Sequence, residues 1–197
     1  VIVGADKMSS IIDYEDRATC IIFGDGAGAV LLEANEDNLG LQDSVLKSNA
    51  AGKEHLHIKA GGSAKQNTIE TIQAKEHLVY QNGKPVFKAA VSGMSSVVKD
   101  VMQRNDLQVE DIDWLVPHQA NIRIIESVAR MADFPIERVM VNIHKYGNTT
   151  AATLPLCLYD WEKRLKPGNK LILTAFGGGY TWGATYLVWG YDSPAKS

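Results

Sequence analysis

The stretch Trp114 to Asn121, WLVPHQAN, decides how this chain is organised. Its apolar run from Trp114 to Val116 predicts a buried strand, and Pro117, which has no backbone N–H to donate, ends that strand. His118 is therefore expected at the carboxyl end of a strand, where ligands bind in open α/β sheets. A single histidine in that place is more often a hydrogen-bonded structural residue, so its neighbours in the fold have to decide its role.

Composition excludes several classes of protein. With 197 residues, 45% of them hydrophobic and 8% aromatic, the chain suits one domain or two small ones of an α/β protein. The net charge is −3 and there is no run of lysine or arginine, so we expect neither a nucleic-acid partner nor a membrane partner. No apolar run is long enough to span a bilayer and no signal-peptide pattern is present, which predicts a cytoplasmic location. The two cysteines, Cys20 and Cys157, lack CxxC or metal-type spacing and are expected to be core thiols in a reducing compartment.

The first residues predict a strand that needs neighbours. Val1-Ile2-Val3-Gly4 has the length and β-branching of a buried strand, and the chain starts there without a methionine. A buried parallel strand needs a neighbouring strand on each edge. We therefore expect this chain to be the downstream part of a longer polypeptide, with a polar connection from Asp6 to Arg17 after the strand.

A glycine-rich stretch follows. In Cys20–Glu33, CIIFGDGAGAVLLE, glycines at every second position from Gly24 to Gly28 separate two apolar runs typical of strands. Such glycines allow backbones to approach closely, which favours a tight strand-turn-strand packing element. The alternative is a loop that binds phosphate, but the lysine and hydroxyl of a P-loop and the acidic ribose partner of a dinucleotide fold are missing.

The segment from Glu33 to about Asn82 is polar and weakly periodic, and we expect it to bridge two structural halves with short strands inside it. His55 and His57 lie two residues apart and would share one face of a strand. A metal site would need a third ligand, and the sequence does not point to one. No metal site is therefore predicted.

Two amphipathic helices are predicted on either side of the strand at Trp114. In the first, at 83–105, apolar residues recur at helical spacing and would pack on a sheet, although Phe87 and Met94 could instead line a ligand tunnel. In the second, at 120–133, Arg123 and Arg130 share an outward face that is either simply solvated or a docking surface for an acidic partner. The expected apolar faces are Phe87, Val91, Met94, Val98 and Val101 in the first helix and Ile122, Ile125, Ala129 and Ala132 in the second.

The rest of the chain is expected to alternate strands and helices. We predict a buried strand at Val139–Ile143, a helix that includes residues 154–165 with Pro155 in its first turn or at a kink, and final strands at Lys170–Phe176 and Gly183–Tyr191. The resulting order α-β-α-β-α-β-β describes a mixed sheet with helices on its faces.

Three ends of predicted strands should meet in one crevice. They bring together His118, Asn148 after the strand at 139–143, and the glycines Gly177 to Gly179. A neutral imidazole, a carboxamide NH₂ and a backbone N–H are donors that can hold a developing oxyanion. This combination indicates stabilisation of an enolate or a tetrahedral intermediate, since no Ser-His-Asp arrangement and no GxSxG elbow is visible.

Four ordered motifs resemble β-ketoacyl-acyl-carrier-protein synthase III over essentially the whole chain. They are FGDGAGAVLLE, WLVPHQAN with Arg123 two residues further on, KYGNTTAA with its asparagine thirty residues after the histidine, and AFGGGYTWGA. The resemblance implies an α/β protein of thiolase-like fold, with αβαβα layers in two similar halves, that works as a homodimer. It implies that residues 1–75 form the end of the N-terminal half and a bridging segment, and that residues 76–197 form the C-terminal half.

The resemblance also implies an activity at the start of fatty-acid synthesis. A primer acyl group passes from coenzyme A to a cysteine, and malonyl on acyl carrier protein then loses CO₂ and attacks the thioester, giving a 3-oxoacyl-acyl carrier protein. Acyl-CoA is thus a substrate, and no cofactor or metal is implied. By the motifs, His118 and Asn148 would stabilise the enolate, Gly178 would donate an oxyanion N–H, and Phe176 would shape the site.

Two further sets of residues are carried over by the resemblance. The pantetheine channel for coenzyme A would be lined by Gly83, Phe87, Ala120 and Asn121. The acidic acyl carrier protein would dock on Arg123, Lys88 and Arg130.

The chain departs from the family pattern at the nucleophile. The family's reactive cysteine lies in a stretch resembling DTACAG, which is absent here, and neither Cys20 nor Cys157 lies in a context typical of an activated thiol. We therefore expect an acyltransferase fragment that is inactive by itself. The alternative is a non-catalytic subunit or a module of thiolase-like fold that binds acyl carrier protein.

Overall fold

The predicted strand at Trp114 forms and lies in a four-stranded mixed sheet. In the computed structural model, which describes residues 1–192, β6 (Trp114–Pro117) pairs in parallel with β7 (Lys170–Gly177). The sheet continues antiparallel from β7 to β8 (Thr181–Val188) and then to β3 (Gly40–Ser48), in the order β3-β8-β7-β6. Pro117 ends β6, so the residue after it, His118, lies at the carboxyl end as predicted.

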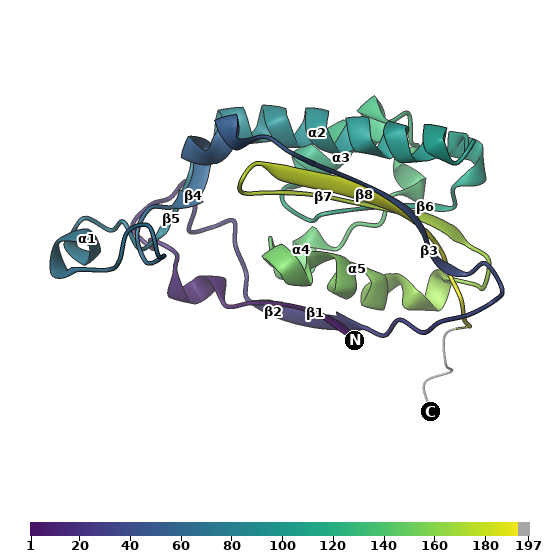
Figure 1. The fold of residues 1–197 in the computed structure, drawn as a ribbon, viewed down its shortest axis with the longest axis horizontal. Helices are drawn as coiled ribbons and strands as arrows, with labels where there is room; N and C mark the ends of the chain where they lie inside the picture. Colours follow the sequence, from purple (N-terminus) through teal and green to yellow (C-terminus); the bar gives the residue numbers. More distant parts are fainter. Residues whose placement is uncertain (193–197) are drawn as a thin grey trace.

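Helices cover both faces of this sheet (Figure 1). α2 (Gly83–Arg104) and α3 (Ile122–Met131) lie on one face, and α5 (Thr153–Trp161) lies on the other. Beyond α5, the antiparallel pair β1 (Ile2–Asp6) and β2 (Gly26–Val30) forms a second sheet. The described residues therefore stack in alternating helix and strand layers. None of the helices within residues 1–192 has both the length and the apolar character needed to cross a membrane.

The remaining elements are short. β4 (Leu56–Ile58) and β5 (Val79–Gln81) pair antiparallel, and with α1 (Ile69–Gln73) they form an arm at the left of Figure 1. α4 (Ile143–Tyr146) precedes α5. Short 3₁₀ helices occur at Met8–Ser10, Ala50–His55, Val109–Asp111, Ile136–Arg138, Thr150–Ala152 and Glu162–Arg164.

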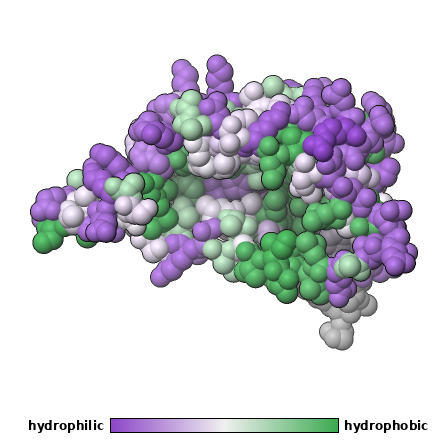
Figure 2. Space-filling model, in the orientation of Figure 1, coloured by the Kyte–Doolittle hydropathy of each residue, from purple (hydrophilic) through white to green (hydrophobic). Residues whose placement is uncertain are grey.

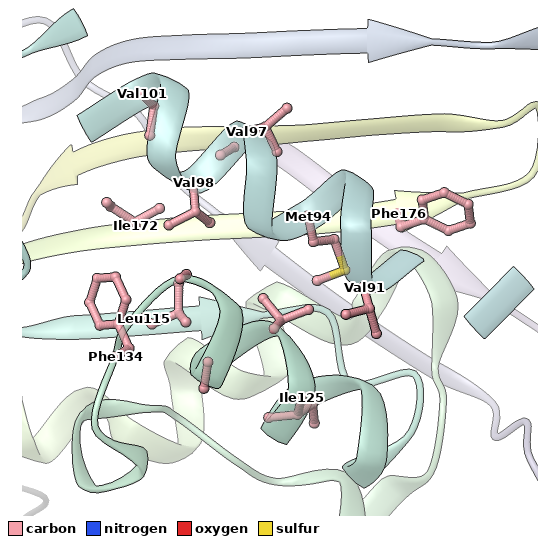
Figure 3. Close-up of a cluster of buried hydrophobic side chains, with 14 of the residues drawn as sticks. Val91, Met94, Val97, Val98, Val101, Leu115, Ile125, Phe134, Ile172 and Phe176 are labelled. Atoms are coloured by element: carbon pink, nitrogen blue, oxygen red, sulfur yellow. The ribbon is translucent and has the colours of Figure 1, made fainter. Parts of the chain in front are cut away.

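The main core lies between α2, α3 and the four-stranded sheet (Figure 3). The predicted apolar face of α2 is confirmed at four of its five positions, because only Phe87 remains 37% exposed. In α3 the prediction for Ile122 is wrong, since this side chain is 44% exposed. Ile122 is the first helical residue, and side chains in a helix tilt toward its N-terminus, so this one projects beyond the packed face. The buried residues of α3 are Ile124, Ile125, Val128 and Ala129.

The predicted strand at Val139–Ile143 is wrong. Val139 forms a single parallel bridge with Leu115, and the N–H of Met140 donates to the carbonyl of Leu115 (2.9 Å). After that, the N–H groups of Asn142 and Ile143 donate to Oε1 of Gln119 (2.9 and 3.1 Å) instead of to a neighbouring strand. A buried side chain thus replaces the strand partner, and helix α4 begins at Ile143.

The glycine-rich segment contains one strand instead of two. Cys20 lies in a run of turns over residues 17–22, and the strand is confined to Gly26–Val30, because the N–H groups of residues 19, 20 and 22 bond within those turns. A Cβ at Gly24 would lie 2.2 Å from the carbonyl oxygen of Tyr146, and one at Gly28 would lie 2.6 Å from Cβ of Pro155. Glycine is needed here for close packing on α4 and α5, which supports the packing interpretation.

The first strand forms where predicted, but it is not buried. Val1, Ile2 and Val3 are 83%, 54% and 65% exposed, and only Gly4 is buried. β1 pairs with β2 on one edge, and no described strand lies on its other edge. Figure 2 shows hydrophobic residues gathered on the side of the molecule where β1 and β2 lie in Figure 1.

The expected division of the chain at residue 75 remains a prediction. β3 lies within residues 1–75, yet it pairs with β8 of the second part along its whole length. The segment expected to be a bridge therefore contributes an edge strand to the main sheet.

The position of β6 predicts which leucine matters for stability. Leu115 is fully buried, whereas Leu46 on the edge strand β3 is 80% exposed. Leu115→Ala should lower the free energy of unfolding by about 2 to 5 kcal/mol through lost burial and a residual cavity. Leu46→Ala should change it by no more than about 0.5 kcal/mol. Urea unfolding of both variants measures this, and equal effects would contradict the burial of Leu115 between the helices and the sheet.

Candidate active site

A cavity of about 650 Å³ opens beyond the carboxyl ends of β6 and β7. Figure 2 shows the hollow in the middle of the molecular face. The predicted catalytic residues His118, Asn148, Phe176 and Gly178 all line it. So do the predicted channel residues Gly83, Phe87, Ala120 and Asn121. Residues as far apart in the sequence as Gly83 and Gly178 therefore line one cavity.

His118 is held by the sheet and shielded from water. Its backbone N–H donates to the carbonyl of Thr174 on β7 (2.7 Å), which continues the β6–β7 ladder beyond Pro117. The side chain is 8% exposed, and Nδ1 is buried without a hydrogen-bond partner among the described residues. Burial lowers the pKa of this imidazole from 6.5 to about 4. The ring is therefore neutral at physiological pH and can donate one N–H without carrying charge.

Asn148 reaches the cavity from a tight loop and not, as predicted, from the end of a strand. Gly147, with φ of 67°, turns the chain after α4 in a conformation that favours glycine. The N–H of Asn148 donates to the carbonyl of Ile22 (3.0 Å), and its carbonyl accepts from the N–H of Gly24 (2.9 Å). Oδ1 accepts from the N–H of Thr150 (3.0 Å), while the NH₂ group donates to no described residue. The amide donors are therefore free for a ligand.

The turn between β7 and β8 supplies a third donor. Gly178 is exposed at the cavity, and its N–H has no acceptor among the described residues. A Cβ at this position would lie 3.3 Å from the carbonyl oxygen of Leu56, so a side chain would crowd the cavity wall. Phe176 is buried, with its ring 4.8 Å from that of Tyr180 and 6.3 Å from that of Trp182.

Gln119 supports the site from behind the cavity wall, and the sequence did not single it out. It is 1% exposed, and its Nε2 donates to the carbonyls of Pro117 (2.7 Å) and Met140 (3.1 Å). Its Oε1 accepts from Asn142 and Ile143, and its backbone N–H donates to Oγ1 of Thr153 (2.7 Å). One side chain thus joins the end of β6 to the segment before Asn148. The one available signal was a polar residue directly after a buried strand.

The cavity walls come partly from segments in which the sequence predicted no site residues. β4 and β5 contribute Leu56, His57, Val79 and Gln81, and the N-terminal segment contributes Met8, Ile11, Ala18, Ile22 and Phe23. Phe87 and Met94 of α2 also line the cavity, so the tunnel alternative for these two residues agrees with their position. Most of the lining is apolar, which strengthens electrostatic interactions inside it.

Asn121 has a structural task besides its place at the cavity. Its Oδ1 accepts from the N–H of Arg123 (2.8 Å) and caps the N-terminus of α3. Only the NH₂ group of this side chain is left to meet a ligand.

The three predicted docking residues are exposed but do not form one cluster. Lys88 follows Phe87 on α2, and Arg123 lies in the first turn of α3, both beside residues of the cavity wall. Arg130 lies about two turns further along α3, roughly 10 Å away at 1.5 Å per residue. There it lines a separate shallow groove with Glu126, Ala129, Phe134 and Ile136.

Neither cysteine lies at the cavity. Cys157 is fully buried in α5, and burial raises the pKa of its thiol to about 12. Cys20 is half-buried in the turns before β2. Within residues 1–192 no group of three or more histidine, cysteine or acidic side chains is arranged to hold a metal ion.

The fold and the site together define the class of protein. A mixed sheet between helical layers, with a second sheet beyond α5 and polar donors where β6 and β7 end, is the thiolase-like fold that the sequence predicted. The chain belongs to the 3-oxoacyl-[acyl-carrier-protein] synthase III family. The model of that family matches residues 1–50, and the model of its C-terminal part matches residues 102–189.

Relatives in this family are similar over nearly the whole chain. The β-ketoacyl-[acyl-carrier-protein] synthase III of Porphyromonas gingivalis is 54% identical over 192 residues, which cover 98% of this chain and 57% of the relative. That of Phocaeicola vulgatus is 54% identical over 196 residues, covering 100% and 59%. The crystal structure of 3-oxoacyl-(acyl carrier protein) synthase III from Pseudomonas aeruginosa superposes with a TM-score of 0.86 at 39% identity, covering 98% and 58%. The chain thus spans less than three fifths of the length of these relatives.

The buried neutral imidazole predicts a loss of stability in acid. Because the pKa of His118 falls from 6.5 to about 4 on burial, protonation between these values favours the unfolded chain. The contribution is complete above pH 6.5 and is lost as pH falls toward 4, by about 3 kcal/mol in total. Between about pH 7 and 4.5 the wild type should lose stability relative to His118→Gln, so the difference between their free energies of unfolding should change steadily with pH. A difference that stays constant with pH would mean that His118 is not buried in its neutral form.

Proposed function

We propose that this chain forms the C-terminal part of an acyltransferase that starts fatty-acid synthesis. The proposed reaction is a decarboxylative Claisen condensation of an acyl-CoA primer with malonyl on acyl carrier protein, which gives a 3-oxoacyl-acyl carrier protein. The observation that carries the proposal is the pair of uncharged donors, the imidazole of His118 and the NH₂ of Asn148, at one apolar cavity. Membership of the synthase III family supports it.

The chemistry of decarboxylation matches these donors. When the carbon–carbon bond to the carboxylate breaks, CO₂ leaves and the electron pair forms an enolate on the malonyl thioester. The enolate oxygen gains negative charge, and two neutral N–H donors in an apolar site stabilise it without a permanent ion pair. The enolate carbon then attacks the acyl thioester on the cysteine, and the thiolate leaves. Gly178 donates its N–H to the oxyanion formed in that attack, and Phe176 shapes the adjoining wall.

The nucleophilic cysteine is proposed to come from outside these 197 residues. Cys157 is buried with a pKa of about 12, and Cys20 does not line the cavity, so neither is placed to carry the acyl group. The relatives are longer than this chain, which leaves room for such a residue. By this account the 197-residue chain alone is inactive.

A second candidate function is a binding module for acyl carrier protein. The absence of a cysteine at the cavity is the observation that favours it. Mass spectrometry of the full-length protein after incubation with acyl-CoA separates the two candidates. An acyl group on a cysteine outside this chain supports the enzyme, and an unmodified protein supports the binding module.

The substrates are proposed to approach along α2 and α3. Gly83, Phe87, Ala120 and Asn121 are at the cavity and would contact the pantetheine arm of coenzyme A or carrier protein. The exposed cations Lys88 and Arg123 lie beside them and would meet the acidic carrier protein, with Arg130 as a more distant contact. We also propose, from the family resemblance, a homodimer in the cytoplasm.

Asn148→Asp tests the role of the carboxamide. The change is nearly isosteric and keeps the acceptor for Thr150, but it places an anion where the NH₂ donors face the cavity. In the full-length protein, malonyl-carrier decarboxylation should fall by roughly 10²-fold or more. Acylation of the cysteine by acyl-CoA should continue, because Asn148 is assigned to the later half-reaction. An equal loss of both half-reactions would show that this assignment is wrong.

Arg123→Glu tests the docking surface. If the outward face of α3 meets an acidic carrier protein, KM for malonyl-carrier protein should rise about fivefold at low salt. KM for acyl-CoA should not change, and the defect should shrink as salt screens the contact. Lys166→Glu reverses an exposed cation on the turn before β7 and is the matched control. Unchanged kinetics in Arg123→Glu would show that this helix face is only solvated and does not dock the carrier protein.

A further inference from the structure

The backbone contacts that hold Asn148 come from the first 24 residues of the chain. Its backbone N–H and carbonyl are bound to Ile22 and Gly24, as described above. Its side-chain oxygen is bound to the N–H of Thr150, and Thr150 in turn is bound to Asp6. The catalytic carboxamide of the C-terminal part is therefore fixed by the end of strand β1.

Asp6 binds the loop at two points. Its Oδ2 accepts from Oγ1 of Thr150 (2.5 Å) and from the N–H of Ala151 (2.9 Å). Thr150 has φ of 48°, a left-handed conformation that a β-branched residue rarely adopts without support. The same approach is visible at Gly4, where a Cβ would lie 2.2 Å from the carbonyl oxygen of Ala151. Strand β1 thus packs closely on the loop at Thr150 and Ala151, and the hydrogen bonds from this loop to Asp6 support the left-handed conformation of Thr150.

The conformation of Thr150 decides which end of the Asn148 amide faces the cavity. A carboxamide can rotate by half a turn and exchange its oxygen for its NH₂ group. The N–H of Thr150 is the one hydrogen bond to this amide among the described residues, and it selects the orientation with oxygen inward and NH₂ free. In the opposite orientation an oxygen would face the developing enolate and repel it.

We infer that Asp6 and Thr150 are positioning residues that orient the carboxamide of Asn148 for decarboxylation. The inference rests on the proposed function for the role of Asn148. Asp6 does not line the cavity, so it acts through Thr150 and not by touching substrate. Thr150 does line the cavity, and its hydroxyl is already used by Asp6.

The test uses the full-length protein with four variants. Asp6→Ala removes both contacts to the loop, Thr150→Val removes only the hydroxyl, and Thr150→Ser keeps it. Asp16→Ala is the matched control, because Asp16 also accepts from one hydroxyl, Thr19 Oγ1 (2.7 Å), and one backbone N–H, that of Ala18 (2.9 Å). We expect Asp6→Ala and Thr150→Val each to lower kcat of malonyl-carrier decarboxylation about tenfold, through misplacement of one donor.

Several readouts distinguish positioning from a general structural role. KM and the rate of cysteine acylation should stay within about twofold of wild type, since the loss concerns an interaction made in the transition state. Thr150→Ser and Asp16→Ala should behave as wild type. The double variant of Asp6→Ala and Thr150→Val should be no worse than either single one, because both break the same link.

Unchanged decarboxylation in Asp6→Ala would overturn the inference, as would an equal loss of acylation or an equal loss in Asp16→Ala. If Asp6→Ala does not fold, the pair Thr150→Val and Thr150→Ser decides in the same way. The side-chain NH₂ signal of Asn148 in an amide NMR spectrum, identified by its loss in Asn148→Asp, gives a readout without activity. It should move in Asp6→Ala and stay in Asp16→Ala, and an unmoved signal overturns the inference. A wild-type protein without decarboxylation would instead refute the proposed function, while the NMR signal still decides the orientation.

Discussion

The buried amide of Gln119 is the interaction on which the geometry of the site depends. All of its polar atoms are used inside the protein, where they bind backbone groups at Pro117, Met140, Asn142 and Ile143. A buried backbone N–H or carbonyl without a partner costs free energy, so these four groups need a polar side chain between them. The end of β6 and the segment that leads to Asn148 are thereby held at a fixed separation. The side chains that they carry, His118 and Asn148, can then share one cavity.

Burial also sets the chemistry of the cavity. Removing the imidazole of His118 from water disfavours its charged form and keeps a neutral donor at physiological pH. The amide of Asn148 is neutral at any pH, and the N–H of Gly178 is a fixed backbone dipole. Donors of this kind, set in a mostly apolar wall, stabilise charge that develops during a reaction without binding an anion tightly beforehand. Burial has the opposite use at Cys157, away from the cavity, where it raises the pKa of the thiol to about 12 and so keeps it from acting as a nucleophile.

The two ends of the chain contribute differently to the site. His118 and Gly178 are supported by β6 and β7, within the part matched by the C-terminal family model. Asn148 is supported by Asp6, Ile22 and Gly24, within the part matched by the first family model. The glycines at 4, 24 and 28 allow this, since a Cβ at any of them would overlap α4, α5 or the loop between them. The cavity therefore depends on close packing of the N-terminal segment, with β1 and β2, against α4, α5 and the loop between them.

Local patterns in the sequence were enough to predict much of this protein. The apolar run before Pro117 determined β6 and the place of His118, helical spacing determined the buried face of α2, and the motifs determined the family and the residues that line the cavity. These features depend on neighbours a few residues away, so spacing reveals them. The tertiary structure alone decided that Val139–Ile143 is not a strand and that Ile122 is exposed. It also decided that the apolar side chains of β1 are exposed to solvent, and that Asp6 binds Thr150, which lies 144 positions further along the chain. Each of these depends on which distant group satisfies a backbone hydrogen bond or covers an apolar face, and no local pattern in the sequence specifies that partner.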